Sequence, residues 1–266
     1  MKKRLKDTLS EALGRQSPVN VYNSYDIVGD IAIIRLTEAS KGFCQEIAEA
    51  IMRVHRNVKT VLAQTSAVRG DFRLRELRFV AGENRTVTRY REWGCLFSVD
   101  VRECYFSPRL SFERMRIARQ VGNGEVVLNM FAGVGCFSIL IAKYSNAERV
   151  YSIDANPSAV RYMQENVRMN RVYGRVSCLL GDAKRIVERS LCHTADRVLM
   201  PLPEKAFEYS RKREDVVEKV SSKVAQRLHA LGASFNIPLG RIVRSIGPNW
   251  YQVVLDIEVL EPNRIG

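Results

Sequence analysis

The second half of the sequence alternates short apolar segments with amphipathic ones, and this alternation constrains the fold more than any other feature. Segments with the composition of buried strands begin at Val126, Arg149, Val176 and Asp196, and a segment with helical periodicity follows each of the first three. Alternation of this kind is typical of a parallel sheet covered by helices, because parallel strands need long crossover connections. The sequence therefore predicts an α/β domain over residues 105–266.

After Met200 the alternation stops. No apolar strand stands between the helical stretch that starts at Lys205 and the one that starts at Asp215. The end of the chain returns to strand-like segments over residues 237–243 and 250–260. We therefore expect a Rossmann-like sheet that lacks one strand.

The first 104 residues have a different pattern, with short strands around little helix. Residues 2–14 and 42–54 have helical spacing, and residues 24–36 are typical of two strands joined by a Gly-Asp turn. Further strands are expected over residues 58–64, 73–80, 85–92 and 96–101. The pattern predicts a small N-terminal α+β domain, residues 1–104, without a cofactor motif of its own.

The charge of the chain narrows the class of partner. Lys and Arg number 42 against 29 Asp and Glu, a formal net charge of +13. The alternatives are a solubilising surface and a polyanion partner, and so large a surplus favours nucleic acid. No segment approaches the length of a membrane span, and no signal peptide is recognisable, so a cytoplasmic protein is expected. The six cysteines lack the spacing of a zinc or haem site, so we expect no metal.

A glycine-containing loop follows the first strand of the α/β part. Gly133 and Gly135 stand between residues 127–130 and the next helix, where glycine lets a ligand approach the backbone. Asp154 ends the next strand, where a carboxylate can accept hydrogen bonds from ribose hydroxyls. Asp182 ends the third strand, close to where adenine would lie, although an aspartate there can also cap a helix. Carboxyl ends of parallel strands share one edge, so these residues predict a nucleotide-containing ligand.

Two ligands fit such an edge, S-adenosylmethionine and NAD. A dinucleotide fingerprint would have a third glycine at the position that Ser138 occupies here. A helix is also expected before the first strand, over residues 111–119, with Ser111 as a plausible cap. Both features favour S-adenosylmethionine.

Several motifs together carry a family resemblance. FAGVG at 131–135, IDANP at 153–157 and GDA at 181–183 resemble motifs of class I methyltransferases. More specific signatures are YFSPRLSFER at 105–114, GDFR at 70–73 and RSIGPNWYQ at 244–252. Over most of its length the chain resembles the archaeal and eukaryotic tRNA (guanine-37 N1)-methyltransferase family. The resemblance implies methyl transfer from S-adenosylmethionine to guanine N1 in the anticodon loop of tRNA, with the N-terminal domain positioning the RNA and no obligatory protein partner.

The same resemblance assigns roles to individual residues. Glu113 would be the general base that removes the N1 proton, and Arg73 would stabilise negative charge on the guanine O6. Tyr105 would shape the pocket, and Arg109 or Arg114 would anchor the substrate. The implied cofactor residues are Phe131, Gly133, Gly135, Asp154, Asp182 and Arg109. Without the resemblance, Glu113 would be an acid favoured by the dipole of the first helical turn.

The chain also departs from the family pattern. Asn129 occupies the position of an acidic residue, and Pro201 that of an asparagine whose amide oxygen can orient or accept the N1 proton. A helix and a strand are missing between Tyr209 and Glu214, and the family's separate N-terminal RNA-recognition domain is expected to be absent. Two alternatives follow, an RNA-binding relative with impaired catalysis and a wybutosine-pathway methyl or aminocarboxypropyl transferase acting on the same nucleotide. The Ser-Pro-Arg-Leu run that starts at Ser107 argues against the aminocarboxypropyl reaction.

Overall fold

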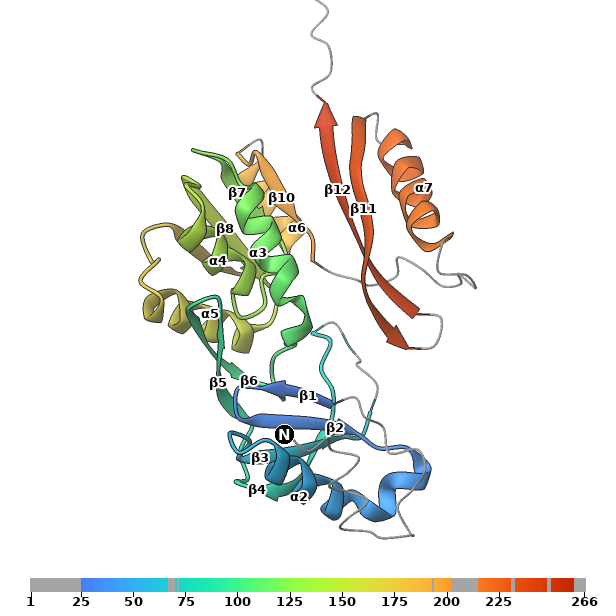
Figure 1. Cartoon of the computed structure of the whole chain (residues 1–266). Coiled ribbons are helices and arrows are strands. Elements are labelled where there is room, and N and C mark those ends of the chain that lie inside the picture. The colour runs from blue at the N-terminus through green and yellow to red at the C-terminus, as the bar shows by residue number, and fades with distance from the viewer. Residues whose placement is uncertain are drawn as a thin grey trace, which may run out of the picture. The chain divides into compact units, whose positions relative to one another are not determined.

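Figure 1 shows the computed structural model of the chain, which describes residues 25–66, 70, 72–192, 194–201, 215–230, 233–247 and 250–260. The chain divides into two compact units, Met1–Pro201 and Leu202–Gly266. The helices expected over residues 2–14 and from Lys205 lie outside the described residues. The domain boundary expected at residue 104 falls inside the first unit and stays a prediction.

The first unit begins with a four-stranded sheet in the order β1-β2-β3-β4. Its strands are β1 (Tyr25–Val28), β2 (Ile31–Arg35), β3 (Thr60–Gln64) and β4 (Leu77–Gly82). Strands β2 and β3 are parallel, and the other neighbours are antiparallel. A 3-10 helix, η2 (Glu38–Phe43), and an α-helix, α2 (Cys44–Val54), make the crossover between the parallel strands. Ile47 and Ile51 of α2 are buried with Val61 of β3 in a local core.

The expected strand over residues 73–80 is shorter than the sequence predicted. Arg73 lies in a turn, because its N–H donates to the Gly70 carbonyl oxygen at 3.0 Å and its φ is 54°. A positive φ is incompatible with extended strand backbone. Regular pairing therefore starts only at Leu77, where β4 begins.

An antiparallel hairpin, β5 (Val87–Glu92) and β6 (Cys95–Asp100), connects this sheet to the rest of the first unit. Trp93 and Gly94 form its two-residue turn, with φ values of 47° and 70°. Both values are positive, as two-residue hairpin turns of this kind require.

The second sheet of the first unit confirms the predicted alternation. Its four parallel strands are ordered β10-β7-β8-β9. They are β7 (Val126–Asn129), β8 (Arg149–Asp154), β9 (Val176–Leu180) and β10 (Arg197–Leu199), and the helices are α3 (Ser111–Gln120), α4 (Cys136–Tyr144), α5 (Pro157–Met169) and α6 (Ala183–Ile186). A π-helical turn, η4 (Val187–Leu191), extends α6. The strand order reverses beside β7, and ligands of open α/β sheets bind at such a reversal.

The cap expected for α3 was wrong. A 3-10 turn, η3 (Pro108–Leu110), leads directly into the helix, Leu110 is its N-cap, and Ser111 is already its first residue. Because the preceding turn is itself helical, the chain enters α3 without the extended backbone that a serine cap normally adopts.

One hydrophobic core joins the two sheets of the first unit. Leu62 of β3, Phe97 of β6, Ile139 of α4 and Met163 of α5 are almost fully buried in the same cluster. The N-terminal elements therefore have a local core on the α2 face of their sheet and are also packed onto the Rossmann-like part through this shared core.

The second unit is described through one helix and one long hairpin. Helix α7 (Asp215–Ala230) packs on β11 (Ser234–Gly247), which pairs antiparallel with β12 (Trp250–Leu260) (Figure 1). No strand lies within residues 215–230, as predicted, while residues 202–214 are outside the described part. Among the helices of the described residues, none is long and apolar enough to cross a membrane.

Candidate cofactor and substrate site

The loop between β7 and α4 is built around two glycines with positive φ. At Gly135, φ is 90°, and a β-carbon would lie 2.9 Å from the Met163 Cγ and 3.3 Å from the Ile139 Cδ1. At Gly133, φ is 56°, and the nearest atom to a β-carbon would be the Tyr105 carbonyl oxygen at 3.9 Å. Gly135 thus allows close packing, and Gly133 leaves space above the loop. The first N–H groups of α4 follow this loop directly, have no partner inside the helix, and are available to a ligand at its N-terminus.

Asp154 fixes this loop from the end of β8. Its Oδ2 accepts a hydrogen bond from the Gly133 N–H at 2.7 Å, and its Oδ1 accepts one from the Asn156 N–H at 2.9 Å. Burial raises the pKa of the Asp154 carboxyl above its ordinary value. Each carboxylate oxygen can accept a second hydrogen bond, so the group can still receive a ribose hydroxyl.

Asp182 has a structural task in addition to the predicted one. It is the N-cap of α6, where its Oδ1 accepts a hydrogen bond from the Arg185 N–H at 2.9 Å. The preceding Gly181 donates its N–H to the Asp154 carbonyl oxygen at 3.0 Å, which holds the ends of β8 and β9 together. The side chain of Asp182 remains exposed at the predicted edge of the sheet.

Asn129, which ends β7 at a position where the family pattern has an acidic residue, is fully buried. Its Nδ2 donates to the Ser138 Oγ at 3.0 Å, while its Oδ1 has no hydrogen-bond partner within the described residues. An unsatisfied buried acceptor is costly unless a ligand or water meets it. Together with the open face of Gly133 and the acceptors of Asp154, it makes this edge fit a nucleoside-containing cofactor.

Arg73 and Tyr105, which are far apart in sequence, meet at the same loop. The Arg73 guanidinium carbon lies 4.7 Å from the centroid of the Tyr105 ring, a cation–π contact. Tyr105 is also the residue whose carbonyl oxygen lies nearest to Gly133. The structure therefore brings two of the three predicted catalytic residues together, with Tyr105 beside the Gly133 loop, and Phe131 belongs to the same loop.

Glu113 lies in the first turn of α3, and only 3% of its surface is exposed. Arg116 donates to both of its carboxylate oxygens at distances from 2.6 to 3.1 Å. This burial excludes the alternative of a solvated acid that merely complements the helix dipole. A buried carboxylate held by an arginine has a fixed orientation, as a positioned proton acceptor requires.

Arg114 is engaged inside the protein, and the substrate-anchoring role that the sequence left open for it stays a prediction. Its Nη1 donates to both carboxylate oxygens of Glu92 at 3.0 and 2.8 Å, and its Nη2 donates to the Ser107 carbonyl oxygen at 2.9 Å. Arg114 is 4% exposed, so it faces the interior. Its role is to hold the segment between Tyr105 and Glu113 against the β5–β6 hairpin.

Arg109 is also engaged, through a contact that the sequence did not indicate. Its Nε donates to the Asp26 Oδ1 of β1 at 2.7 Å. Asp26 lies 4.0 Å from the Arg75 Nη1, and the Arg75 Nη2 donates to the Phe106 carbonyl oxygen at 3.1 Å. Asp26 therefore ties the first sheet to the segment that carries Tyr105, and a cofactor role for Arg109 stays a prediction.

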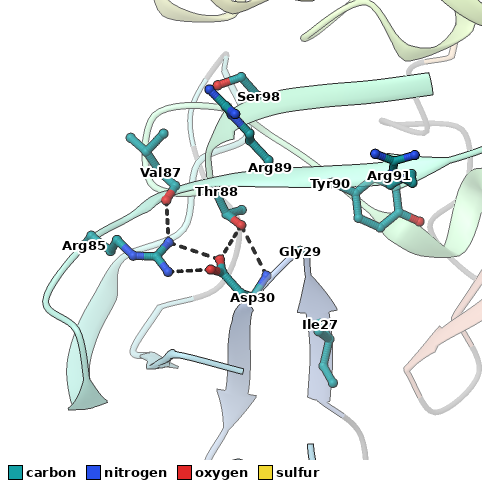
Figure 2. Close-up of a pocket in the computed structure, with 10 residues that line it drawn as sticks. All are labelled: Ile27, Gly29, Asp30, Arg85, Val87, Thr88, Arg89, Tyr90, Arg91 and Ser98. Atoms are coloured by element: carbon teal, nitrogen blue, oxygen red, sulfur yellow. Dashed lines mark hydrogen bonds and ion pairs between the residues drawn. The ribbon is translucent and has the colours of Figure 1, made fainter. Parts of the chain in front are cut away.

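A cavity of about 720 Å³ lies elsewhere in the first unit, between the β1–β2 turn and β5 (Figure 2). Figure 2 shows the Asp30 carboxylate between Arg85 and Thr88, which donate to it at 2.6–3.0 Å. Burial opposes ionisation of Asp30, but the hydrogen bonds from Arg85 and Thr88 outweigh it and lower its pKa. None of the predicted site residues lines this cavity. We assign a structural role to the Asp30 hydrogen bonds, which join the β1–β2 turn to the β5–β6 hairpin.

Two thiols near the site, those of Cys104 and Cys136, are buried. Burial raises the pKa of Cys104 and of Cys136 to about 12, so both stay protonated at neutral pH. Within the described residues, no group of three or more His, Cys, Asp or Glu side chains is arranged to hold a metal ion.

A parallel sheet that reverses beside a GxG loop, with an aspartate at the end of the next strand, is typical of Rossmann-like nucleotide-binding proteins, among them the class I methyltransferases. The model of the TRM5/TYW2 methyltransferase domain matches residues 88–224, and that of the TYW2 N-terminal domain matches residues 4–86. The chain belongs to the TRM5/TYW2 family of methyltransferases.

Two relatives illustrate the range of that family. The tRNA (guanine(37)-N(1))-methyltransferase Trm5b of Pyrococcus abyssi is 38% identical over 254 residues, which are 89% of this chain and 74% of that protein. The tRNA 4-demethylwyosine(37)-methyltransferase Taw21 of Saccharolobus solfataricus is 38% identical over 259 residues, which are 91% of this chain and 96% of that protein.

Solved structures agree with this assignment. The crystal structure of Pyrococcus abyssi Trm5b superposes with a TM-score of 0.77 at 37% identity, covering 94% of this chain and 77% of that one. The complex of aTrm5 with tRNALeu superposes with a TM-score of 0.79 at 29% identity, covering 98% of this chain and 79% of that one. The α/β fold with its N-terminal part, expected from the sequence, is confirmed.

Proposed function

We propose that this enzyme methylates N1 of guanosine 37 in tRNA. The observation that carries the proposal is the meeting of Arg73 and Tyr105 with the Gly133 loop, which Asp154 fixes at 2.7 Å. A basic group of the N-terminal part, Arg73, would then lie with an aromatic ring, Tyr105, beside the cofactor edge. The identity of 38% with a Trm5b that acts on guanosine 37 supports the same reaction, and the net charge of +13 suits an RNA substrate.

S-adenosylmethionine is the cofactor, and it supplies an electrophilic methyl group on a sulfonium. Gly133 and Gly135 would admit it to the backbone, Asp154 would accept its ribose hydroxyls, and Asp182 would lie near its adenine. Asn129, whose Oδ1 is a buried acceptor without a partner among the described residues, offers a further hydrogen bond to the cofactor. This acceptor stands where an acidic residue is expected, so an amide oxygen replaces a carboxylate oxygen in the same contact.

The residues of the chain account for the proton and the charge. Guanine N1 carries a proton and is a poor nucleophile, so the proton must leave as the new N1–carbon bond forms. Glu113 would take that proton, with Arg116 keeping its carboxylate in position. Arg73 would face the negative charge that develops on O6. Pro201 has no side-chain oxygen, so proton removal depends on Glu113 more than it would in a chain with asparagine there.

The test is methyl transfer from tritiated S-adenosylmethionine to unmodified tRNA, followed by nucleoside analysis. Label in 1-methylguanosine supports the proposal. Absence of transfer, with salt-sensitive RNA binding retained, would show instead a binding protein with impaired catalysis.

A second candidate is methylation of 4-demethylwyosine at the same position. Two observations favour it, the match to 96% of the length of Taw21 and the presence of Pro201 in place of an amide side chain. A carbon nucleophile in a tricyclic base has no need of the amide oxygen that would orient an N1 proton. The same assay on tRNA that carries 4-demethylwyosine separates the two reactions, because label then appears in the tricyclic nucleoside.

A further inference from the structure

Two aromatic rings lie exposed where the β5–β6 turn meets the start of α3. Phe112 exposes 80% of its surface and Trp93 exposes 37%. Their ring centroids are 5.8 Å apart, and the ring planes meet at 86°. A phenylalanine this exposed on a helix contributes little to the core, and exposed aromatic clusters commonly mark binding surfaces.

Trp93 is held in place by hydrogen bonds with two neighbours, one to its ring and one to its backbone. Its Nε1 donates to the Ser111 carbonyl oxygen at 3.0 Å, and its own carbonyl oxygen accepts a hydrogen bond from the Tyr144 hydroxyl. Its φ of 47° is unusual for a bulky residue, and such strain persists only where the surroundings impose it. The Trp93–Phe112 pair is therefore a rigid surface that needs little ordering when it binds.

Positive charge surrounds this aromatic pair. Arg116 and Arg119 follow Phe112 by four and seven residues, so they share its face of α3, although the charge of Arg116 is paired with Glu113. The Arg119 guanidinium carbon is 6.0 Å from the centroid of the Trp93 ring, and its side chain is exposed. Lys143, next to Tyr144 on α4, is exposed as well. An aromatic surface with a cationic rim complements a single-stranded nucleic acid, whose bases stack while its phosphates pair with arginine.

We propose that Trp93 and Phe112 form a stacking platform for an unpaired base of the substrate RNA that flanks the target guanosine. This inference rests on the proposed function, since it takes the anticodon loop as the substrate. Phe112 and Glu113 lie in the first turn of α3, with Phe112 on its exposed face and Glu113 on its buried face. A base stacked on Phe112 would therefore hold the RNA on the outer face of the helix that carries the proposed proton acceptor. Loop bases are recognised in this way because every base presents a π face once it is unstacked.

The test uses an anticodon stem-loop RNA in which 2-aminopurine replaces, in turn, each nucleotide beside guanosine 37. Stacking lowers the emission of 2-aminopurine, so the parent protein should quench one of the two labels. Phe112→Ala should abolish that quenching and weaken RNA binding roughly 5- to 150-fold, the range expected for one base–aromatic stack. Phe112→Leu, which keeps apolar volume without a π face, should behave like alanine, and Phe112→Tyr like the parent.

A matched control is Tyr173→Ala. Tyr173 is also largely exposed, at 73%, but it lies between α5 and β9. This variant should quench and bind as the parent does. Because Phe112 is exposed, its variants should keep the parent circular dichroism spectrum, so loss of binding would not reflect unfolding.

Two results would overturn the platform. One is parent-like quenching and affinity in Phe112→Ala. The other is a parent dimer, seen by light scattering, that dissociates in Phe112→Ala, since a second copy would then cover the rings. The fluorescence readout needs no methyl transfer. A parent that stacks the label but leaves guanosine N1 unmethylated would refute the proposed function and keep the platform.

Discussion

The side-chain amide of Asn166 forms two hydrogen bonds with the backbone of Ser98, as a neighbouring β-strand would. Its Oδ1 accepts from the Ser98 N–H at 2.7 Å, and its Nδ2 donates to the Ser98 carbonyl oxygen at 3.0 Å. One turn later, Asn170 makes the equivalent pair with Leu96 at 2.9 and 2.7 Å. Helix α5 thus satisfies the edge of β6 with two side chains, and this fixes the N-terminal part on the methyltransferase sheet.

Asn166→Ala should lower the free energy of unfolding substantially. Asn166 is fully buried, and its Nδ2 also donates to the Val134 carbonyl oxygen at 3.0 Å. Removal leaves buried backbone groups unpaired, at about 1–3 kcal/mol for each group. Urea denaturation followed by circular dichroism measures the change. Asn146→Ala, which removes only an exposed hydrogen bond to Asn123, should be nearly neutral. Equal effects of the two variants would show that the hydrogen bonds of Asn166 to Ser98 do not stabilise the protein.

Glu113→Gln should lower the single-turnover methylation rate by about 10²–10⁴-fold, the usual contribution of a general base. Glutamine keeps the shape and one acceptor oxygen for Arg116, so RNA and cofactor affinities should change little. Arg73→Ala should reduce both rate and binding, since it would remove the charge that we propose faces the substrate. An exposed control on α5, Glu165→Gln, should react as the parent does. A parent-like rate for Glu113→Gln across the pH range would leave solvent as the proton acceptor.

Asp154→Asn should weaken S-adenosylmethionine binding by about 10–100-fold, because charge-assisted hydrogen bonds are worth about 1.5–3 kcal/mol. The amide keeps one acceptor and presents an N–H₂ group to either Gly133 or Asn156, so the loop also loses a tether. Calorimetry measures the affinity. Asp196→Asn is the matched control, because Asp196 is exposed before β10, at the opposite edge of the sheet, and an asparagine there still accepts the Val126 N–H. If both variants lose affinity equally, Asp154 has no special part in holding the ribose.

The sequence predicted the Rossmann-like half almost element by element, because buried parallel strands and amphipathic helices have strong and different periodicities. It also predicted the edge that joins Gly133 to Asp154, since strand ends and glycines are local signals. The turn at Arg73 was missed, because it depends on a left-handed φ, which a non-glycine residue rarely adopts and which the sequence therefore does not predict.

Contacts between segments that are distant in the chain could not be predicted from the sequence. The burial of Arg114 against Glu92 and the pairing of Arg109 with Asp26 join residues that no periodicity relates. Asn166 and Asn170 left one usable signal, two asparagines four residues apart on the buried face of a helix. Polar residues are rarely placed on such a face unless their amides have partners.

Glu125→Gln should destabilise the protein at neutral pH and have almost no effect in acid. Glu125 precedes β7, and Arg197 of β10 donates to its Oε2 at 2.7 Å and to its Oε1 at 3.0 Å. Those bonds, with a further one from the Gly122 N–H, hold the pKa of the Glu125 carboxyl below its ordinary value near 4.5. Because the folded state has the lower pKa, the stabilisation is fully present above that ordinary value and disappears as the pH falls through the folded pKa.

The Glu125–Arg197 pair is partly exposed, so we expect a difference of about 1 kcal/mol in the free energy of unfolding between variant and parent at neutral pH. Urea denaturation of both proteins at neutral pH and at about pH 3 measures it. In the Arg197→Gln background the substitution should cost much less, because the partner is already gone. A difference that is the same at both pH values would show that glutamine disturbs packing at this site and that the ion pair contributes nothing.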